Sequence, residues 1–460
     1  MKLVYDTKDK PKFGQLLVFA LQQLLAIVAA TIAVPMIVSG SYDCGDVQMS
    51  TVAALVGAGV GTLVYILLTK AKSPVFLGSS FAFLGSMSAA FAGAATVALG
   101  YLGLILGAAC AGLVYVLIAL VVKLCGVKWI NKLMPPIVIG PTVAIIGFTL
   151  AGNAIDNLQK GSFLVNGEPT ASVHLCILCG LITLFVTMVC SVFGKKLVKL
   201  IPFIIGILAG YAIASVATVI GITTGNDAWK IIDFSSFTAL FADGVHFSSF
   251  ITIPDFSFLK AFGAFDQLTP GYFGTIAVAY VPVAFVVLAE HIADHKNISS
   301  IIGHDLLEDP GLHRTLMGDG IGSFFGALVS GAPNTTYGES IACVALSGNA
   351  SIITIVCTSL ITITVAFIAP VAAFLASIPP CVIGGVCIAL YGFISVSGLK
   401  MMQPLDLGDN RNLFVASVIL MTGIGGLVLT FGQITITSVA CALILGIIAN
   451  QALKKKADRA

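Results

Sequence analysis

Long apolar runs separated by short polar stretches dominate the sequence and predict its elements. A helix of about 20 apolar residues can cross the hydrocarbon core of a bilayer, and the chain divides into fourteen such segments. In order they lie near residues 15–39, 51–69, 75–97, 101–122, 134–154, 174–193, 200–222, 270–295, 312–330, 334–349, 351–375, 381–400, 412–430 and 434–452. The pattern therefore predicts an all-α polytopic membrane protein with fourteen transmembrane segments.

The third and tenth segments differ from the others because each begins with residues that do not favour a helix. The third opens with Gly78-Ser79-Ser80-Phe81 and the tenth with Asn334-Thr335-Thr336-Tyr337. We expect each to be discontinuous, a short strand followed by a half-helix whose free N–H groups face a cavity near mid-membrane. Non-helical backbone at that depth must be covered by protein or water. Pairing of the two strands would give their backbone N–H and C=O groups hydrogen-bond partners. The alternative is two ordinary spans with polar N-caps.

The two halves of the chain follow the same plan. Seven segments end near residue 222, a polar and aromatic stretch runs to 269, and seven more segments follow. Two repeats with an odd number of spans have opposite orientations in the membrane. This inverted arrangement is common among secondary transporters.

Composition and charge agree with this topology. Of the 460 residues, 58% are hydrophobic and 10% are charged, whereas soluble domains carry about 25% charged residues. With the N terminus inside, 20 Lys and Arg residues fall in cytoplasmic stretches and 3 (Lys160, Lys230 and Lys260) on the opposite face, which accounts for all 23. This asymmetry follows the positive-inside rule and predicts that both termini are cytoplasmic.

Carboxylates within or beside apolar segments are the candidate chemistry. Glu290 lies near the end of one apolar run and Glu339 lies between two others. A carboxylate there is costly unless it is protonated, paired or facing water, so both are candidate substrate or proton sites. Asp294 follows Glu290 by one helical turn on the same face, and it could equally be an interfacial charge. Asp319 begins the ninth segment and is interpreted as a structural polar group.

Nothing in the sequence indicates an enzyme. It has no nucleophile–base set, His-Glu-x-x-His motif or phosphate loop, and its eleven cysteines lack disulfide or metal spacing. We therefore predict a transporter without a metal or cofactor and without a nucleic-acid partner. No sodium-binding cage is visible, although backbone carbonyls could form one.

Several blocks resemble the nucleobase–ascorbate transporter family, also called the nucleobase–cation symporters, and within it the bacterial uracil permeases. They are Gly78-Ser79-Ser80-Phe81-Ala82-Phe83, Ala289-Glu290-His291, Asp309-Pro310-Gly311-Leu312-His313-Arg314, Pro333-Asn334-Thr335-Thr336-Tyr337-Gly338-Glu339, and Ile378-Pro379-Pro380-Cys381-Val382-Ile383-Gly384-Gly385 through Tyr391-Gly392 to Gly398. The resemblance runs over essentially the whole chain. It implies a multi-pass protein of the bacterial cytoplasmic (inner) membrane.

The resemblance also implies a division into two domains. Segments 1–4 and 8–11 (residues 15–125 and 270–375) would form a core domain that binds the substrate. Segments 5–7 and 12–14 (residues 126–225 and 376–452) would form a gate domain, through which a homodimer is possible. Residues 226–269 would be the extracytoplasmic connection between the repeats.

In such a transporter the substrate would lie between the two half-helices. The matching positions are Phe81 and Gly338 for backbone contacts, Glu290 and Glu339 for carboxylate contacts, Ala30 and Tyr337 beside the ring, and Tyr391 on the gate side. Phe81 and Tyr337 could instead serve only in packing.

The activity that the resemblance implies is import of a nucleobase, uracil first, by proton symport through alternating access. The proton-coupling candidates are Glu290, Asp294, Glu339 and His295, with Na⁺ as the alternative ion. Gln22-Gln23 stands where uracil permeases carry Gln-His, and Asp294 stands where they carry a histidine. The resemblance therefore does not assign the residues that carry the proton. The alternative functions are a purine or xanthine permease and an anion transporter of the sulfate type, against which two acidic site residues argue.

Overall fold

The part of the chain that the computed structural model describes comprises residues 3–40, 48–126, 129, 133–165, 168–195, 197–242, 244–431 and 434–454. Both ends of the chain lie outside it, so the placement of the termini stays a prediction. Seven of the basic residues used to predict the topology also lie outside it: Lys2, Lys128, Lys132, Lys196, Lys455, Lys456 and Arg459.

Helices make up most of the described residues. They are α1 (Phe13–Gly40), α2 (Thr51–Leu68), α3 (Leu84–Ala92), α4 (Val97–Cys125), α6 (Pro136–Leu158), α7 (Val173–Phe193), α8 (Leu197–Leu200), α9 (Pro202–Thr224), α10 (Ser235–Leu240), α11 (Ser257–Ala261), α12 (Pro270–Ile302), α13 (Leu312–Ser330), α14 (Gly338–Ser347), α15 (Ile352–Val365), α16 (Ala369–Ser377), α17 (Pro380–Met402), α18 (Asn410–Ile424) and α19 (Ser438–Ala452). Within these residues, eight helices (α1, α2, α4, α6, α7, α9, α12 and α17) are long and apolar enough to cross a membrane.

Capping residues mark the ends of several of these helices. The Thr96 side chain accepts a hydrogen bond from the Leu99 N–H at the start of α4, and Thr269 caps α12 in the same way. Such caps satisfy N–H groups that the first turn of a helix leaves without partners. At the other end, Gly331 and Gly348 follow α13 and α14 with φ of +78° and +68°, which glycine adopts without strain.

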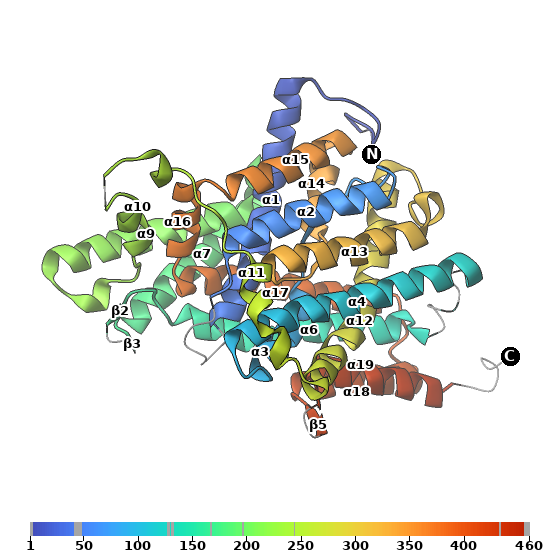
Figure 1. Cartoon of the computed structure of the whole chain (residues 1–460). Coiled ribbons are helices and arrows are strands. Elements are labelled where there is room, and N and C mark those ends of the chain that lie inside the picture. The colour runs from blue at the N-terminus through green and yellow to red at the C-terminus, as the bar shows by residue number, and fades with distance from the viewer. Residues whose placement is uncertain are drawn as a thin grey trace.

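The long helices pack in two groups. In one, α13 lies between α2 and α4, while α15 packs on α2 and α12 packs on α4, and Figure 1 shows α2, α13 and α4 side by side. In the other, α17 packs along α6 and α7, while α9 packs on α7, and α18 and α19 form a pair beside α6. Contacts of α12 with α19 and of α1 with α9 join the two groups.

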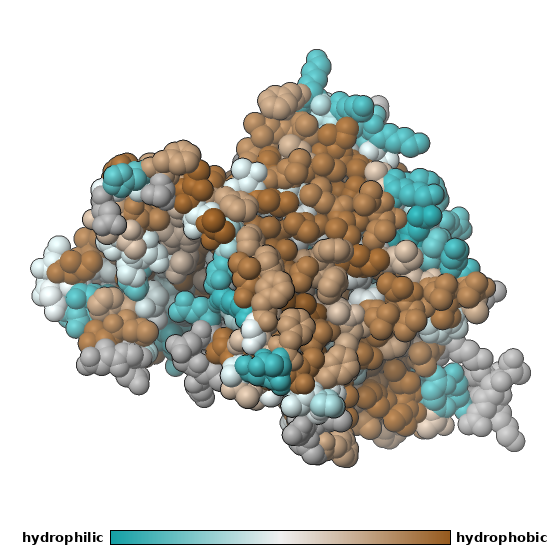
Figure 2. Space-filling model, in the orientation of Figure 1, coloured by the Kyte–Doolittle hydropathy of each residue, from teal (hydrophilic) through white to brown (hydrophobic). Residues whose placement is uncertain are grey.

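The surface is largely apolar, as a lipid-facing surface requires. Figure 2 shows a broad hydrophobic face over the packed helices, with hydrophilic residues gathered at the edge near the N-terminal segment. Large apolar side chains point outward from α7, such as Phe185 and Phe193, which are 62% and 76% exposed. An apolar surface of this extent would be unusual for a soluble monomer, so it supports the prediction of a polytopic membrane protein.

Three short two-stranded ribbons accompany the helices. They are β1 (Leu77–Ser79) with β4 (Asn334–Thr336), β2 (Leu164–Val165) with β3 (Glu168–Pro169), and β5 (Leu429–Phe431) with β6 (Ile434–Ile436). The β1–β4 ribbon is antiparallel and pairs Leu77 with Thr336 and Ser79 with Asn334. Because α3 follows β1 and α14 follows β4, both expected strand-plus-half-helix units are present, and their strands pair with each other.

Three of the last four predicted segments are less regular than expected. The segment predicted over 351–375 breaks after α15, and the turn pairs with the connection between the two halves (residues 226–269) through an Ile251–Ile368 bridge. The segments predicted over 412–430 and 434–452 each include one strand of the β5–β6 hairpin. The α15, α18 and α19 helices have 14, 15 and 15 residues, or about 21–23 Å at 1.5 Å per residue. Continuous helices over those three ranges were therefore wrong.

Candidate functional site

The β1–β4 ribbon brings the starts of the two half-helices together. Tyr337, the residue before α14, folds its ring over Gly78 of β1, where a Cβ atom would lie 2.3 Å from the ring. Its hydroxyl donates a 2.8 Å hydrogen bond to the Ser79 carbonyl. Gly78 is therefore required by a close approach, and Tyr337 fixes where α14 begins.

Neighbouring helices supply hydrogen-bond partners for further polar groups of the ribbon. The Asn334 N–H donates to Ser323 Oγ of α13 (2.9 Å), and the Asn334 side chain donates to the Gly57 carbonyl of α2 (2.9 Å). The Leu77 N–H donates to Thr62 Oγ1 of α2. Extended backbone in the middle of a membrane protein needs such internal partners, so α2 and α13 hold the ribbon in place.

A cavity of about 390 Å³ opens beside the ribbon. Glu290 and Asp294 from α12 and Glu339 from the first turn of α14 place three carboxylates on its wall. Helices α6, α9 and α17 add apolar residues to the lining, among them Phe203 and Phe393. Small-molecule sites typically have this size and this mixture of an apolar wall with a few polar groups.

The start of α14 presents backbone donors to the cavity. Gly338 is the first residue of α14, no side chain caps this end, and a Cβ atom added to Gly338 would have no atom within 4 Å. The first N–H groups of a helix have no partner within the helix and attract acceptors. Phe81 also lines the cavity, at the turn between β1 and α3. The open space at Gly338 fits the approach of a ligand to the backbone.

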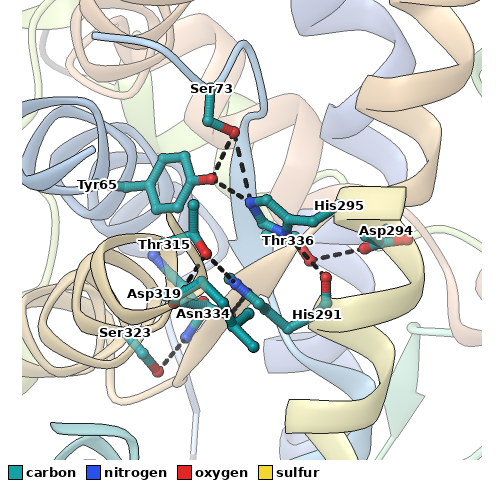
Figure 3. Close-up of polar contacts among 11 residues, drawn as sticks. Tyr65, Ser73, His291, Asp294, His295, Thr315, Asp319, Ser323, Asn334 and Thr336 are labelled. Atoms are coloured by element: carbon teal, nitrogen blue, oxygen red, sulfur yellow. Dashed lines mark hydrogen bonds and ion pairs between the residues drawn. The ribbon is translucent and has the colours of Figure 1, made fainter. Parts of the chain in front are cut away.

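The carboxylates differ in their partners. Asp294 accepts a 2.6 Å hydrogen bond from Thr336 Oγ1 at the end of β4, as Figure 3 shows. The Glu290 side chain has no hydrogen-bond partner within the described ranges, so it is available to a ligand or a proton. Lys199 of α8 also lines the cavity and is the cation among its lining residues.

His291 and His295 do not line the cavity. Figure 3 shows both side chains directed from α12 toward a polar network that includes Tyr65, Thr315 and Asp319. His291 Nδ1 lies 2.7 Å from Asp319 Oδ2, and both side chains are fully buried. The two imidazole rings stack with centroids 4.0 Å apart, and His295 Nε2 lies 2.6 Å from the Tyr65 hydroxyl. His295, a predicted proton candidate, thus lies behind the cavity wall. The contact of Asp319 Oδ2 with His291 agrees with its interpretation as a structural polar group. Its Oδ1 has no partner among the described residues.

Two other predicted site residues lie outside the cavity lining. Ala30 of α1 is buried in an apolar cluster that also contains Tyr337. Tyr391 of α17 is buried, and its ring meets the Phe81 ring edge-on with centroids 6.0 Å apart, a favourable geometry for aromatic pairs. Tyr391 therefore contacts the site through Phe81.

Some residues around the cavity could not be found from the sequence alone. Lys199 lies in a predicted cytoplasmic loop, and only the packing of α8 beside α1 and α14 brings it to the cavity. Gln23, one of the departures from the uracil permease pattern, donates a 2.5 Å hydrogen bond to Ser340 Oγ in the first turn of α14. Ser340 Oγ also accepts from the Phe76 N–H. Gln23 thus ties α1 to the half-helix that carries Glu339.

Comparison with solved structures defines the class of fold. The chain superposes on the murine Solute Carrier 26 family member A9 anion transporter in its inward-facing state, with a TM-score of 0.63. The match covers 97% of this chain and 69% of that one at 12% sequence identity. The chain thus shares the fold of that polytopic membrane protein.

Sequence comparison then identifies the family. The model of the Permease family matches residues 14–431. The uracil permease of Bacillus caldolyticus is 36% identical over 452 residues, covering 98% of this chain and 94% of that protein. That of Bacillus subtilis (strain 168) is 35% identical over 469 residues, covering 99% and 98%. The chain belongs to the nucleobase–ascorbate transporter family. Its relatives are permeases, which confirms the prediction of a transporter rather than an enzyme.

Proposed function

We propose that the chain is a secondary active transporter that imports a nucleobase, uracil, together with a proton. One observation carries this proposal: Glu290 and Glu339 share a cavity with the uncapped start of α14. The relatives named as uracil permeases supply the substrate class. Related purines such as xanthine are the alternative within the same family.

The donors and acceptors of the cavity match the edge of uracil. A pyrimidine base alternates C=O acceptors with N–H donors, and each polar group left unpaired in a dry site costs about 1–3 kcal/mol. Glu290 and Glu339 would accept from the ring N–H groups, while the backbone N–H groups at Gly338 and Phe81 would donate to the carbonyls. Tyr337 would lie beside the ring, with Ala30 behind it and Tyr391 on the gate side.

Coupling to protons would use the same carboxylates. Two or three carboxylates in one cavity repel one another, so a neutral base binds best after a proton has neutralised part of that charge. Inward movement of one positive charge provides about 2.3 kcal/mol per 100 mV of membrane potential. Glu290 and Glu339 would take up the proton, and Asp294 would pass it toward the cytoplasm. His295 would act only through the buried network, because it does not reach the cavity.

Alternating access would move the two helix groups relative to each other. The group around α13 would be the core domain (residues 15–125 and 270–375), and the group around α17 the gate domain (126–225 and 376–452), joined by the connection 226–269. The carboxylates come from the first group, whereas the second group contributes eight apolar lining residues from α6, α9 and α17. Sliding one group past the other would therefore open and close the site, and the exposed face of α18 is available for a gate-domain dimer.

The proposed orientation makes this conformation open to the inside. Fourteen segments in two inverted repeats would cross the bacterial inner membrane, with both termini in the cytoplasm. Lys199 and Met401, at the mouth of the cavity, lie at helix ends that the positive-inside rule assigns to the cytoplasm. The base would then be released on the cytoplasmic side.

Uptake into proteoliposomes tests the function. We expect labelled uracil to accumulate under an inward proton gradient, to stop accumulating with a protonophore, and to be displaced by unlabelled uracil. Displacement by xanthine instead would identify a purine permease. Accumulation driven only by Na⁺ would show that Na⁺, not the proton, is the coupling ion. Uptake of sulfate without uracil would identify an anion transporter.

Glu339→Gln tests the site. The amide keeps the shape but loses the charge and one acceptor, so uptake should be abolished or nearly so in a folded, correctly inserted protein. Elution as a single monodisperse species in detergent would check the folding. Normal uptake kinetics in this variant would show that Glu339 does not bind the substrate or the proton.

A further inference from the structure

A second cavity lies on the far side of Phe81 from the carboxylates. It has a volume of about 200 Å³, and its wall includes Asn153 near the C-terminal end of α6 and Thr437 before α19. Both positions fall at the predicted extracytoplasmic ends of their segments. Phe81, Ala82 and Ile146 line both cavities. The Phe81 and Ile146 side chains therefore form the layer that separates the inner cavity from the outer one.

The chemistry of the outer cavity differs from that of the inner one. Among the residues that the structure describes, none that lines it carries a charge, and six of them are neutral and polar. These are Ser86, Ser88, Thr149, Asn153, Thr437 and Ser438. A charged solute would lose its hydration there without a compensating partner. The free-energy cost of desolvating a neutral polar ring would be much smaller. The lining thus suits an uncharged heterocycle with both donors and acceptors.

Most of these polar side chains are already engaged within the protein. Ser86 Oγ donates to the Ala279 carbonyl (2.7 Å), Thr149 Oγ1 donates to the Ile146 carbonyl (3.1 Å), and Thr437 caps α19. In contrast, the side chains of Asn153 and Ser438 make no hydrogen bond to any residue that the structure describes. The Asn153 amide offers a donor and an acceptor side by side. That pair is complementary to an adjacent C=O and N–H on a base edge, as in amide recognition of bases.

We propose that this outer cavity is a second nucleobase-binding station, where Asn153 holds the base before it passes Phe81 and Ile146. The assignment rests on the proposed function, since it takes the substrate class from it. The outer station selects solutes that are uncharged and have a matching pattern of hydrogen-bond donors and acceptors. The inner site then binds the base together with a proton. A base bound at Asn153 contacts neither Glu290 nor Glu339, because neither lines the outer cavity. Binding at the station is therefore independent of the carboxylates.

Protection of an introduced cysteine tests the station in the full-length protein. The reporter is Ser438→Cys in right-side-out vesicles, labelled with a membrane-impermeant maleimide, with the parent chain as the background for its natural cysteines. Saturating uracil should slow labelling at least threefold, and it should do so equally when Glu339→Gln is added. Asn153→Ala should raise the half-protecting uracil concentration about tenfold, which corresponds to 1.4 kcal/mol. A control cysteine at Thr223, exposed near the end of α9, should label at the same rate with and without uracil.

Each other outcome counts against a defined part of the inference. If Ser438→Cys resists labelling, or if uracil fails to protect it in vesicles that take up uracil, the outer station does not exist. If protection disappears with Glu339→Gln, it reflects movement driven from the inner site, which overturns the station but keeps the proposed function. Full protection in Asn153→Ala overturns the role of Asn153. If vesicles of the parent chain do not take up uracil and uracil does not protect Ser438→Cys, the proposed function is overturned as well.

Discussion

Replacing Gly78 by alanine tests how tightly the ribbon controls the site. The added Cβ would lie 2.3 Å from two atoms of the Tyr337 ring and 2.8 Å from its hydroxyl oxygen. The ring is 4% exposed and packs within an apolar cluster, so it has little space to move into. We expect Gly78→Ala to displace Tyr337 and with it the start of α14.

The size of this effect follows from two contributions. Overpacking a filled interior costs about 1–3 kcal/mol, and loss of the hydrogen bond from Tyr337 to the Ser79 carbonyl costs about 0.5–1.5 kcal/mol. The free energy of unfolding should therefore fall by about 1.5–4.5 kcal/mol. Because Tyr337 directly precedes Gly338 and Glu339, the affinity for uracil should fall at least tenfold, or about 1.4 kcal/mol.

Thermal unfolding and equilibrium uracil binding on the purified protein measure both effects. Gly152→Ala is the matched control, since Gly152 is exposed in α6 and has no atom within 4 Å of an added Cβ. It should bind uracil as the parent does and gain about 0.5–1 kcal/mol from the helix propensity of alanine. A Gly78→Ala protein with the parent's melting temperature and affinity would refute the packing of Tyr337 on Gly78. Lower stability with unchanged affinity would refute the link from Tyr337 to the site.

Two further substitutions separate binding from coupling. Gly338→Val should leave thermal stability nearly unchanged, because the new side chain enters open space, but should weaken uracil binding at least tenfold in a filter-binding assay; equal affinity would show that the base does not lie against this turn. Asp294→Asn should keep equilibrium binding, because its amide oxygen can still accept from Thr336, while accumulation driven by a proton gradient collapses and uracil exchange continues. Full accumulation in the same reconstituted mutant would exclude a relay, and parallel loss of expression, binding and accumulation would indicate a structural role.

The sequence predicted the ribbon because its composition breaks the apolar pattern. Gly78-Ser79-Ser80 and Asn334-Thr335-Thr336 are poor helix formers placed where a helix would otherwise run, and each is followed by small residues that favour one. The same reasoning missed the β5–β6 hairpin and the break before α16, because Leu, Ile, Val and Phe satisfy a strand and a buried helix equally well. An apolar composition indicates that a segment lies in the lipid or the protein interior. In a short run it does not distinguish a strand from a helix.

Helix periodicity also explains what could be predicted within the site. Glu290 and Asp294 are four residues apart and share the cavity face of α12, as predicted. His291 and His295 repeat the same spacing about 100° around the helix, which turns both imidazoles toward α2 and α13. The pairing of His291 with Asp319 depends on how α12 and α13 are aligned, and that alignment cannot be read from either segment alone.

The β1–β4 ribbon sets an order for the assembly of the protein in the membrane. Its strands are made at residues 77–79 and 334–336, so at about 5–20 residues per second the second strand follows the first by roughly 13–50 s. During that interval α1, α2 and α4 can insert, but the backbone of β1 lacks its partner and the start of α3 has no fixed position. The binding site therefore forms only when the second repeat has been made. A chain that ends before this repeat can insert its helices into the membrane but cannot bind the substrate.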